Sequence, residues 1–309
     1  MTYFARPAAR RSISTAVGLL GDRLPGELPA AVHPVALFGR LMNGVESRVY
    51  SPSRNAGVVY ALLGVALGAA TGLLGRSTVA ALTVAAAGRS LRETALQVNR
   101  ALVLSGPDGA RILLPALVGR DPSELDESGV AAATVESVAE NTVDAVVAPA
   151  CWALAGGAAG AIGYRAINTM DAMVGHRSAR YEQFGWCSAR LDDGANFVPA
   201  RLTAILVAAV RPRAAKEIWR AAREDAPAHP SPNSGVAEAA FAAALGLELG
   251  GALRYGARLE HRPLLGRGAR PRSIDIERAV RLSNDVELAL VAALLGAAIW
   301  ACAAPGRPR

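Results

Sequence analysis

Three uncharged stretches of about membrane-spanning length constrain the fold of this chain more than any other feature. They run from Asn55 to Gly75, from Ala145 to Tyr164 and from Leu288 to Gly306. A helix needs about 20 apolar residues to cross roughly 30 Å of hydrocarbon. Because 52% of the residues are apolar and the mean hydropathy is +0.25, we predict an all-α fold, a polytopic membrane helical bundle with polar, partly helical cytoplasmic inserts. A soluble, alanine-rich helical protein is the alternative.

The predicted organisation is a single integral membrane domain over residues 1–309. Candidate membrane segments lie near residues 13–21, 56–75, 77–88, 145–164, 202–210 and 288–305, and the polar inserts cover 89–144, 165–201 and 211–287. The last insert is the most basic, which favours the cytoplasmic side. Pro149 and the glycines at 156, 157 and 160 leave open whether the segment 145–164 crosses fully or breaks and re-enters. A turn is predicted at GPDG, residues 106–109.

Glycines at helical spacing predict close helix packing. Gly64, Gly68 and Gly72 form one row, and Gly156 and Gly160 form a second. Such spacing lets two helix backbones approach closely in lipid.

An acidic row lies at the edge of the second uncharged stretch. Glu136, Glu140 and Asp144 recur every four residues, so on a helix they share one face. Like charges at this spacing repel one another, which predicts that a metal ion or an arginine sits beside them.

The insert 165–201 concentrates polar side chains. Asp192 and Asp193 precede Gly194, which suits a turn that holds a hard cation such as Mg²⁺, although an ordinary solvated turn has the same pattern. Nearby arginines could hold phosphate or carboxylate oxygens, or form a basic belt at the membrane surface. The insert's other candidates are Asn168, Asp171, His176, Arg177, Arg190 and Arg201.

A second polar loop, DAPAHPSPNSG, presents His229, Asn233 and Ser234. We expect Ser234 or Gly235 to cap a helix that begins at Val236. Free N–H groups at such a helix start can bind an anion, and simple capping is the alternative.

Composition excludes several classes of site. Among 33 basic residues Lys216 is the only lysine, and no GxxxxGK[ST] motif occurs, so any phosphate must be held by arginine and backbone N–H groups. The three cysteines and four histidines lack metal-ligand spacing, and we expect neither zinc nor disulfides. Basic residues alternate with acidic ones, which argues against nucleic-acid binding.

Several sequence blocks carry a family resemblance. They are HPV at His33, VGRD at Val118, ESVAENTVDAVVAP, YRAINTMDAMVGHRSARYEQFGW, SARLDDGANFVPARLTA, and HPSPNSG followed by EAAFAAALG. With these blocks the chain resembles the adenosylcobinamide-phosphate synthase family, the CobD/CbiB-type membrane proteins of cobalamin biosynthesis.

The resemblance implies ATP-dependent joining of adenosylcobyric acid to (R)-1-amino-2-propanol or its O-phosphate, which gives adenosylcobinamide or its phosphate. It also implies a multi-pass protein of the bacterial inner membrane that uses ATP and Mg²⁺, beside other membrane-associated enzymes of cobalamin assembly. A membrane transporter or scaffold that binds a corrinoid without turnover is the rival function, and a soluble helical binding module is a third.

We assign hypothetical roles on this basis. The catalytic candidates are Glu140, Asp144, His176 and Arg177, and the metal candidates are Glu136, Asp192 and Asp193. The candidates for binding substrate or ATP are His33, Asn141, Asn168, Asp171, Arg190, Arg201, His229, Asn233 and Ser234.

Overall fold

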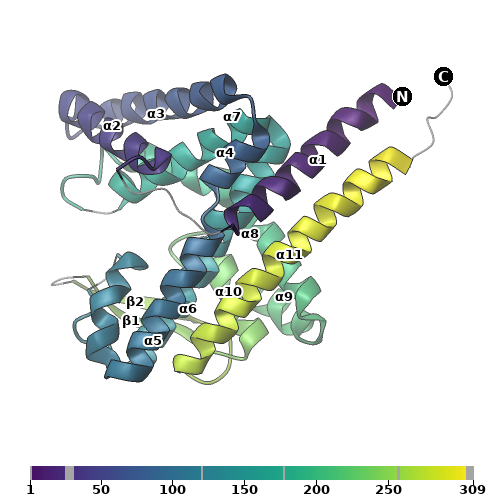
Figure 1. Cartoon of the computed structure of the whole chain (residues 1–309). Helices are drawn as coiled ribbons and strands as arrows, with labels where there is room; N and C mark the ends of the chain where they lie inside the picture. Colours follow the sequence, from purple (N-terminus) through teal and green to yellow (C-terminus); the bar gives the residue numbers. More distant parts are fainter. Residues whose placement is uncertain (1, 25–30, 120, 177, 256–257, 304–309) are drawn as a thin grey trace. The chain divides into compact units, whose positions relative to one another are not determined.

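The computed structural model describes residues 2–24, 31–119, 121–176, 178–255 and 258–303 (Figure 1). Its α-helices are α1 (Thr2–Asp22), α2 (Pro34–Val49), α3 (Arg54–Gly75), α4 (Thr78–Ala85), α5 (Gly88–Leu113), α6 (Glu127–Thr142), α7 (Ala148–Met170), α8 (Trp186–Val210), α9 (Ala215–Glu224), α10 (Ser234–Leu245) and α11 (Ser273–Ala303). Shorter helical turns are η1 (Leu114–Ala116), η2 (Val143–Val147), η3 (Asp171–Gly175), η4 (Pro212–Ala214) and η5 (Ala226–Ala228), and two strands, β1 (Leu249–Tyr255) and β2 (Arg258–Leu265), form a hairpin.

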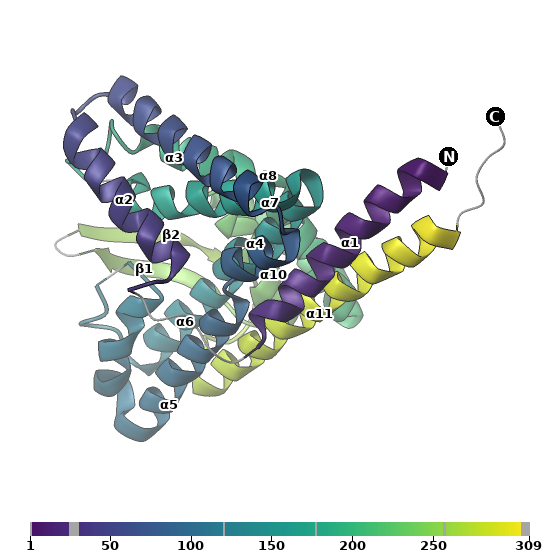
Figure 2. The same ribbon diagram turned by 45° about the horizontal axis from the view of Figure 1, so that its top comes forward.

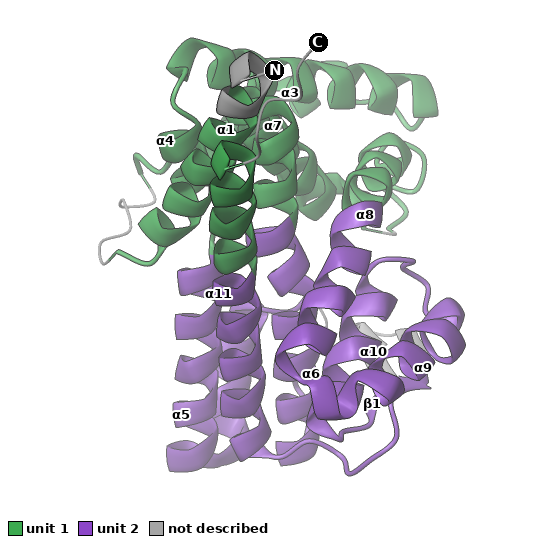
Figure 3. Cartoon of the chain, turned by 90° about the vertical axis from the view of Figure 1, so that its right-hand side faces the viewer, with its two compact units in different colours: residues 1–87, 148–196, 290–309 green, residues 88–147, 197–289 purple. Residues whose placement is uncertain are grey.

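The chain divides into two compact units, coloured separately in Figure 3. Unit 1 holds residues 1–87, 148–196 and 290–309, and unit 2 holds residues 88–147 and 197–289. Helices α8 and α11 contribute residues to both units. The single integral domain stays a prediction.

Four helical stretches among the described residues are long and apolar enough to cross a membrane. They are Arg54–Gly75, Glu127–Gly175, Trp186–Val210 and Ser273–Ala303. The predicted helical fold of a membrane protein is thereby confirmed, and the one sheet in the described part of the chain has two strands.

Helix α8 corrects one expectation from the sequence. The turn predicted at Asp192–Gly194 is wrong, because these residues lie inside the continuous helix Trp186–Val210. Aspartate and glycine cost a helix roughly 0.5–1 kcal/mol each. Contacts with α7 offset this cost: Trp152 Nε1 donates to Ala195 O at 3.1 Å, and Tyr164 Oη donates to Asn196 Oδ1 at 2.8 Å. The short apolar run 202–210 thus belongs to a helix of spanning length.

In unit 1, α3 packs along α7, and α4 lies between α1 and α7 in contact with both (Figure 2). The row Gly64, Gly68, Gly72 faces α7. A Cβ atom at Gly68 would lie 2.6 Å from Ala166 Cβ, and one at Gly72 would overlap the Ala158 carbonyl. The predicted close packing through this row is confirmed.

Helix α7 is interrupted at Gly157, whose φ of 63° and ψ of −141° are not helical. A Cβ atom on Gly160 would overlap the carbonyl of Trp152, eight residues earlier, so the chain folds back on itself at Gly157. A straight helix would separate Trp152 and Tyr164 by about 18 Å along its axis. Here both side chains reach the adjacent α8 residues Ala195 and Asn196. The two ends of α7 therefore lie on the same side of the turn at Gly157. The sequence left open whether the segment 145–164 continues straight or breaks.

In unit 2, helix α6 contacts α5 and α10, and the β1–β2 hairpin packs on α6 and α10. The strands are antiparallel, with Leu249 opposite Leu265 and Gly251 opposite Arg262. This hairpin was not predicted, because glycines and arginines interrupt any apolar alternation in its sequence. The turn predicted at residues 106–109 is confirmed, since Gly106 has a φ of 67° and breaks α5.

A buried ion pair joins α5 to α11 in unit 2. Arg92 Nη1 lies 2.7 Å from Glu287 Oε2, and the Glu287 side chain is 1% exposed. Nearby, Thr142 of α6 donates to Ser283 of α11 at 2.8 Å. A sequence pattern does not identify this pair, because its members lie almost 200 residues apart.

Candidate functional site

Helix α6 places two of the predicted carboxylates in the interior of unit 2. Asp126 caps the helix by accepting from Gly129 N at 2.7 Å, and every residue from 130 to 139 is buried. Glu136 is therefore buried, and Glu140, just after this range, is half-buried. Glu136 and Glu140 lie four residues apart and face one pocket, as the sequence predicts.

Helix α10 brings a third carboxylate to the same pocket. Glu238 is 2% exposed and lies four residues after Ser234, on the same face of the helix. Ser234 Oγ donates to Glu140 Oε1 at 2.7 Å, which ties the start of α10 to α6. Glu238 is not among the site residues predicted from the sequence, although its spacing from Ser234 was a usable signal.

The start of α10 corrects the expected cap. The helix begins at Ser234 and not at Val236, and its N-cap residue is Asn233, whose side chain makes no capping hydrogen bond. Ser231 Oγ accepts from the backbone N–H groups of Asn233 at 3.4 Å and Ser234 at 3.2 Å. This leaves the Ser234 hydroxyl available to bind Glu140.

The β-hairpin closes the site from another side. Gly250 N donates to Glu136 Oε1 at 2.8 Å, and Arg262 Nη1 lies 3.0 Å from His229 Nε2. The pocket has a volume of about 100 Å³. Its walls are Leu117, Val118, Gly119, Glu136, Ser137, Glu140, Glu238 and Arg262.

His229 adjoins this pocket as a neutral imidazole. Burial lowers the pKa of His229, and the positive charge of Arg262 lowers it further. A guanidinium can only donate, so Nε2 accepts from Arg262 and the ring proton sits on Nδ1, where it can donate to Ser231 O at 3.1 Å. Glu238 Oε2 lies 3.8 Å from Nε2. Of the residues that the structure describes, three carboxylates and one guanidinium line the pocket, an excess of negative charge that favours a cationic ligand.

Two other predicted residues of unit 2 lie next to these elements. Arg201 Nη1 donates to Asn233 Oδ1 at 2.8 Å, which links α8 to the loop before α10. Asn141 Nδ2 donates to Ser137 O at 2.9 Å. Asp144 lies in the π-helical turn η2 and is not among the residues that line the pocket.

A separate polar network lies between α7 and α8 in unit 1. Asp192 accepts through Oδ1 from Asn168 at 3.3 Å and through Oδ2 from Asn196 at 2.9 Å. Asn168 in turn accepts from Arg165 at 3.1 Å. Asp193 lies 3.6 Å from Arg190. Neutral amides thus hold Asp192, and an arginine faces Asp193.

The remaining predicted residues of unit 1 lie at helix ends. His33 precedes α2, Asp171 begins η3, and His176 follows η3 with its ring 5.0 Å from that of Tyr181. Arg177 lies outside the described residues. Glu136 belongs to unit 2 and the Asp192–Asp193 pair to unit 1, so their shared magnesium site stays a prediction.

No group of three or more His, Cys, Asp or Glu side chains in the described ranges is arranged to hold a metal ion. Magnesium is commonly held by one or two carboxylates together with phosphate oxygens and water. The pocket carboxylates of unit 2 and the Asp192–Asp193 pair of unit 1 each match that chemistry. Neither group forms a complete ligand set among the described residues.

The model of the CobD/Cbib protein family matches residues 15–283. The chain belongs to the CobD/CbiB family. Cobalamin biosynthesis protein CobD of Mycobacterium tuberculosis is 46% identical over 303 residues, which cover 92% of this chain and 95% of the relative. The protein of the same name from Chromobacterium violaceum is 43% identical over 307 residues, covering 92% and 97%. That from Stutzerimonas stutzeri is 42% identical over 283 residues, covering 87% and 92%.

No solved structure matches this chain. As a CobD/CbiB protein the chain has a role in cobalamin biosynthesis, and corrinoid substrates and a membrane environment follow from that role.

Proposed function

We propose that this CobD/CbiB protein catalyses ATP-dependent amide formation between adenosylcobyric acid and (R)-1-amino-2-propanol or its O-phosphate. The product would be adenosylcobinamide or its phosphate. The observation that carries the proposal is the carboxylate pocket of unit 2, defined by Glu136, Glu140 and Glu238.

The reaction demands two things of the protein. A carboxylate becomes an acyl donor only when its oxygen is made a leaving group, and transfer of a phosphoryl group from ATP does this with release of ADP. The amine then attacks the acyl carbon and phosphate leaves, so one phosphate is released for each amide formed. The amine must first lose a proton, which requires a base near its nitrogen.

The pocket suits the amine. Three carboxylates attract an ammonium group, and a volume of about 100 Å³ corresponds to roughly three water molecules. This space accepts a short alkylammonium chain and is far too small for a corrin ring. We therefore assign the amine to the pocket and propose Glu140 as the base, with Ser234 holding its carboxylate in place.

Phosphate and metal are assigned by donor chemistry. Arg177, Arg190 and Arg201 would hold phosphate or corrin carboxylate oxygens, because guanidinium groups bind both in a bidentate manner. Asp192 and Asp193 would contribute carboxylate oxygens to Mg²⁺, which supplies charge neutralisation at the phosphates when bound. We propose that this takes place at the bacterial inner membrane, in a multi-pass protein beside other membrane-associated enzymes of cobalamin assembly.

The test is a conversion assay on the full chain in detergent. Adenosylcobyric acid, ATP, Mg²⁺ and either amine are supplied, and amide product and released phosphate are measured. We expect one phosphate per amide and a preference for one amine. Corrinoid binding without ATP consumption would instead support a transporter or scaffold and overturn the proposal.

Variants assign the roles. Glu140→Gln should lower turnover by roughly 10²–10⁴-fold, the usual contribution of a general base. Glu93→Gln is the matched control, because Glu93 is an exposed partner of Arg89 on α5, and it should retain parental turnover. Full activity of Asp192→Asn and Asp193→Asn would show that the magnesium assignment is wrong.

A further inference from the structure

Helix α9 carries an exposed basic face directly after a candidate membrane span. Helix α8 ends at Val210, and α9 begins at Ala215 after the short turn η4. Arg213, Lys216 and Arg223 are exposed, and Trp219 is 38% exposed. None of these residues belongs to the carboxylate pocket of the proposed function.

Lys216, Trp219 and Arg223 share one side of α9, and Arg213 lies in the turn before it. Trp219 lies three residues after Lys216 and four before Arg223, the two spacings that place side chains on one helical face. Ile218 and Ala221 are buried where α9 packs on α10. A cationic and aromatic face is therefore turned away from the protein core.

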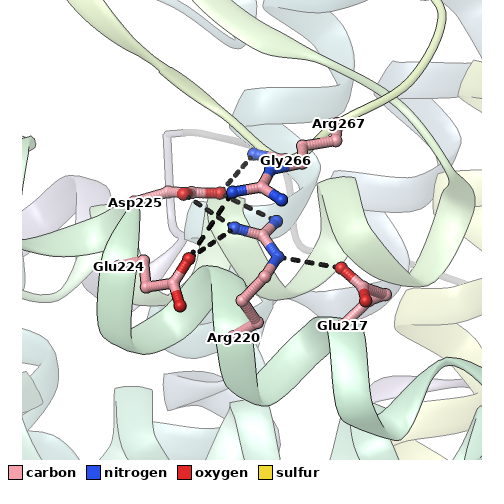
Figure 4. Close-up of polar contacts among 6 residues, drawn as sticks. All are labelled: Glu217, Arg220, Glu224, Asp225, Gly266 and Arg267. Atoms are coloured by element: carbon pink, nitrogen blue, oxygen red, sulfur yellow. Dashed lines mark hydrogen bonds and ion pairs between the residues drawn. The ribbon is translucent and has the colours of Figure 1, made fainter.

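The acidic residues of α9 form ion pairs with arginines, as Figure 4 shows. Arg220 binds Glu217 at 2.8 Å, Glu224 at 3.3 Å and Asp225 at 3.0 Å. These contacts raise the pKa of Arg220 and lower that of Glu217. Asp225 also accepts from Gly266 N at 3.0 Å.

A second guanidinium, Arg267, lies 3.6 Å from Glu224. Arg220 and Arg267 thus offset two of the three acidic charges on one flank of α9. Lys216 and Arg223 are exposed and add two further positive charges to the helix.

We propose that the face formed by Arg213, Lys216, Trp219 and Arg223 lies in the headgroup layer of the bilayer and binds the phosphates of anionic phospholipids. Four residues separate α8 from α9, a reach of about 14 Å at most. The headgroup layer extends roughly 5–8 Å beyond the hydrocarbon on each side, so α9 starts within or next to it if α8 crosses.

The residue types of this face match that layer. Tryptophan is enriched at the membrane interface, and cations near an anionic surface each favour contact by about fivefold. An open hollow of about 440 Å³, lined by Lys216, Trp219, Arg220, Arg223 and Glu224, gives space for a headgroup.

Fluorescence of Trp219 tests this proposal. The chain has four tryptophans, so Trp152, Trp186 and Trp300 are replaced by phenylalanine. The full chain is placed in phosphatidylcholine nanodiscs with or without phosphatidylglycerol, and lipids with a quencher near the headgroup are added. We expect stronger quenching in the anionic nanodiscs by roughly twofold or more.

Matched variants identify the cause. Lys216→Gln with Arg223→Gln should bring the ratio of quenching in anionic to neutral nanodiscs close to one. Arg100→Gln with Arg281→Gln removes two exposed charges from α5 and α11 and should leave the ratio unchanged. Equal loss in both pairs, or a ratio of one in the parent, would overturn the proposal. If the variant that retains only Trp219 does not fold, the quenching of Trp219 is obtained as the difference between the parent chain and Trp219→Phe.

Soluble phosphate distinguishes the source of the anion. Inorganic phosphate added to the detergent-solubilised chain should leave Trp219 emission unchanged. A phosphate-induced change that Lys216→Gln abolishes would show a site for soluble anions, and the lipid assignment would be wrong.

Discussion

Unit 2 buries charge in two different ways. Between α5 and α11, Arg92 and Glu287 form a balanced pair at 2.7 Å. In the pocket beside α6, Glu136, Glu140 and Glu238 outnumber Arg262, while the adjoining His229 is neutral. Among the described residues the pair is matched one to one, whereas the pocket walls carry more carboxylates than guanidinium groups, and this difference separates a structural contact from a candidate site.

The largest expected effect comes from breaking the balanced pair. Glu287→Gln leaves the buried guanidinium of Arg92 without its counter-charge, and the free energy of unfolding should fall by about 3–5 kcal/mol. The measurement is chemical unfolding in detergent. Arg89→Gln breaks an exposed pair on the same helix, with Glu93 54% exposed, and should cost less than about 1 kcal/mol. Equal losses would remove the distinction between buried and exposed pairs.

A smaller loss of stability is expected at the close contact between α3 and α7 in unit 1. Gly72→Ala places a methyl group against the backbone of Ala158, and the free energy of unfolding should fall by about 1–3 kcal/mol. Gly75 is the matched control on the same helix, because nothing lies within 4 Å of its Cβ position. If Gly75→Ala destabilised the protein as much as Gly72→Ala, close packing of α3 on α7 would not be the cause.

The pH dependence of stability reports on His229. Burial lowers the pKa of His229 from its ordinary value of 6.5. Below about pH 6.5 the imidazole is therefore protonated in the unfolded chain and stays neutral in the folded protein. The free energy of unfolding should therefore fall as the pH drops from 7 toward 5, by up to about 1.4 kcal/mol per pH unit. His229→Gln should flatten this part of the curve. Parallel curves for parent and variant would show that another group is responsible.

The smallest effect is expected at the pocket itself. Glu238→Gln removes one of its three carboxylates and relieves repulsion, so the free energy of unfolding should rise by a few tenths of a kcal/mol to about 1 kcal/mol. Turnover should fall at the same time, because the ammonium loses a counter-charge. A clear loss of stability would mean that Glu238 is balanced in the same way as Glu287.

Features that depend on local spacing were predictable from the sequence. The glycine row of α3 and the turn at Gly106 are two examples, and both are confirmed. Glu136 and Glu140 share a pocket as their spacing predicts. Membrane-spanning length in three of the four candidate spans follows from uncharged stretches.

Features that depend on distant partners were not predictable. The turn expected at Asp192 was wrong because contacts from α7 stabilise the helix there. The N-cap of α10 is Asn233 and not Ser234, whose hydroxyl binds the distant Glu140. Arg262 carried no signal, since its position depends on a hairpin that propensity did not indicate.

The sequence by itself determined that the chain is helical, apolar enough for a membrane and a member of the CobD/CbiB family, because hydropathy, periodicity and motif blocks are local properties. Only the tertiary structure decided which carboxylates meet, that α7 folds back at Gly157, and which of the buried charges are balanced. The physical reason is that electrostatic balance depends on distances between side chains, and the chain brings residues close together that are far apart in sequence.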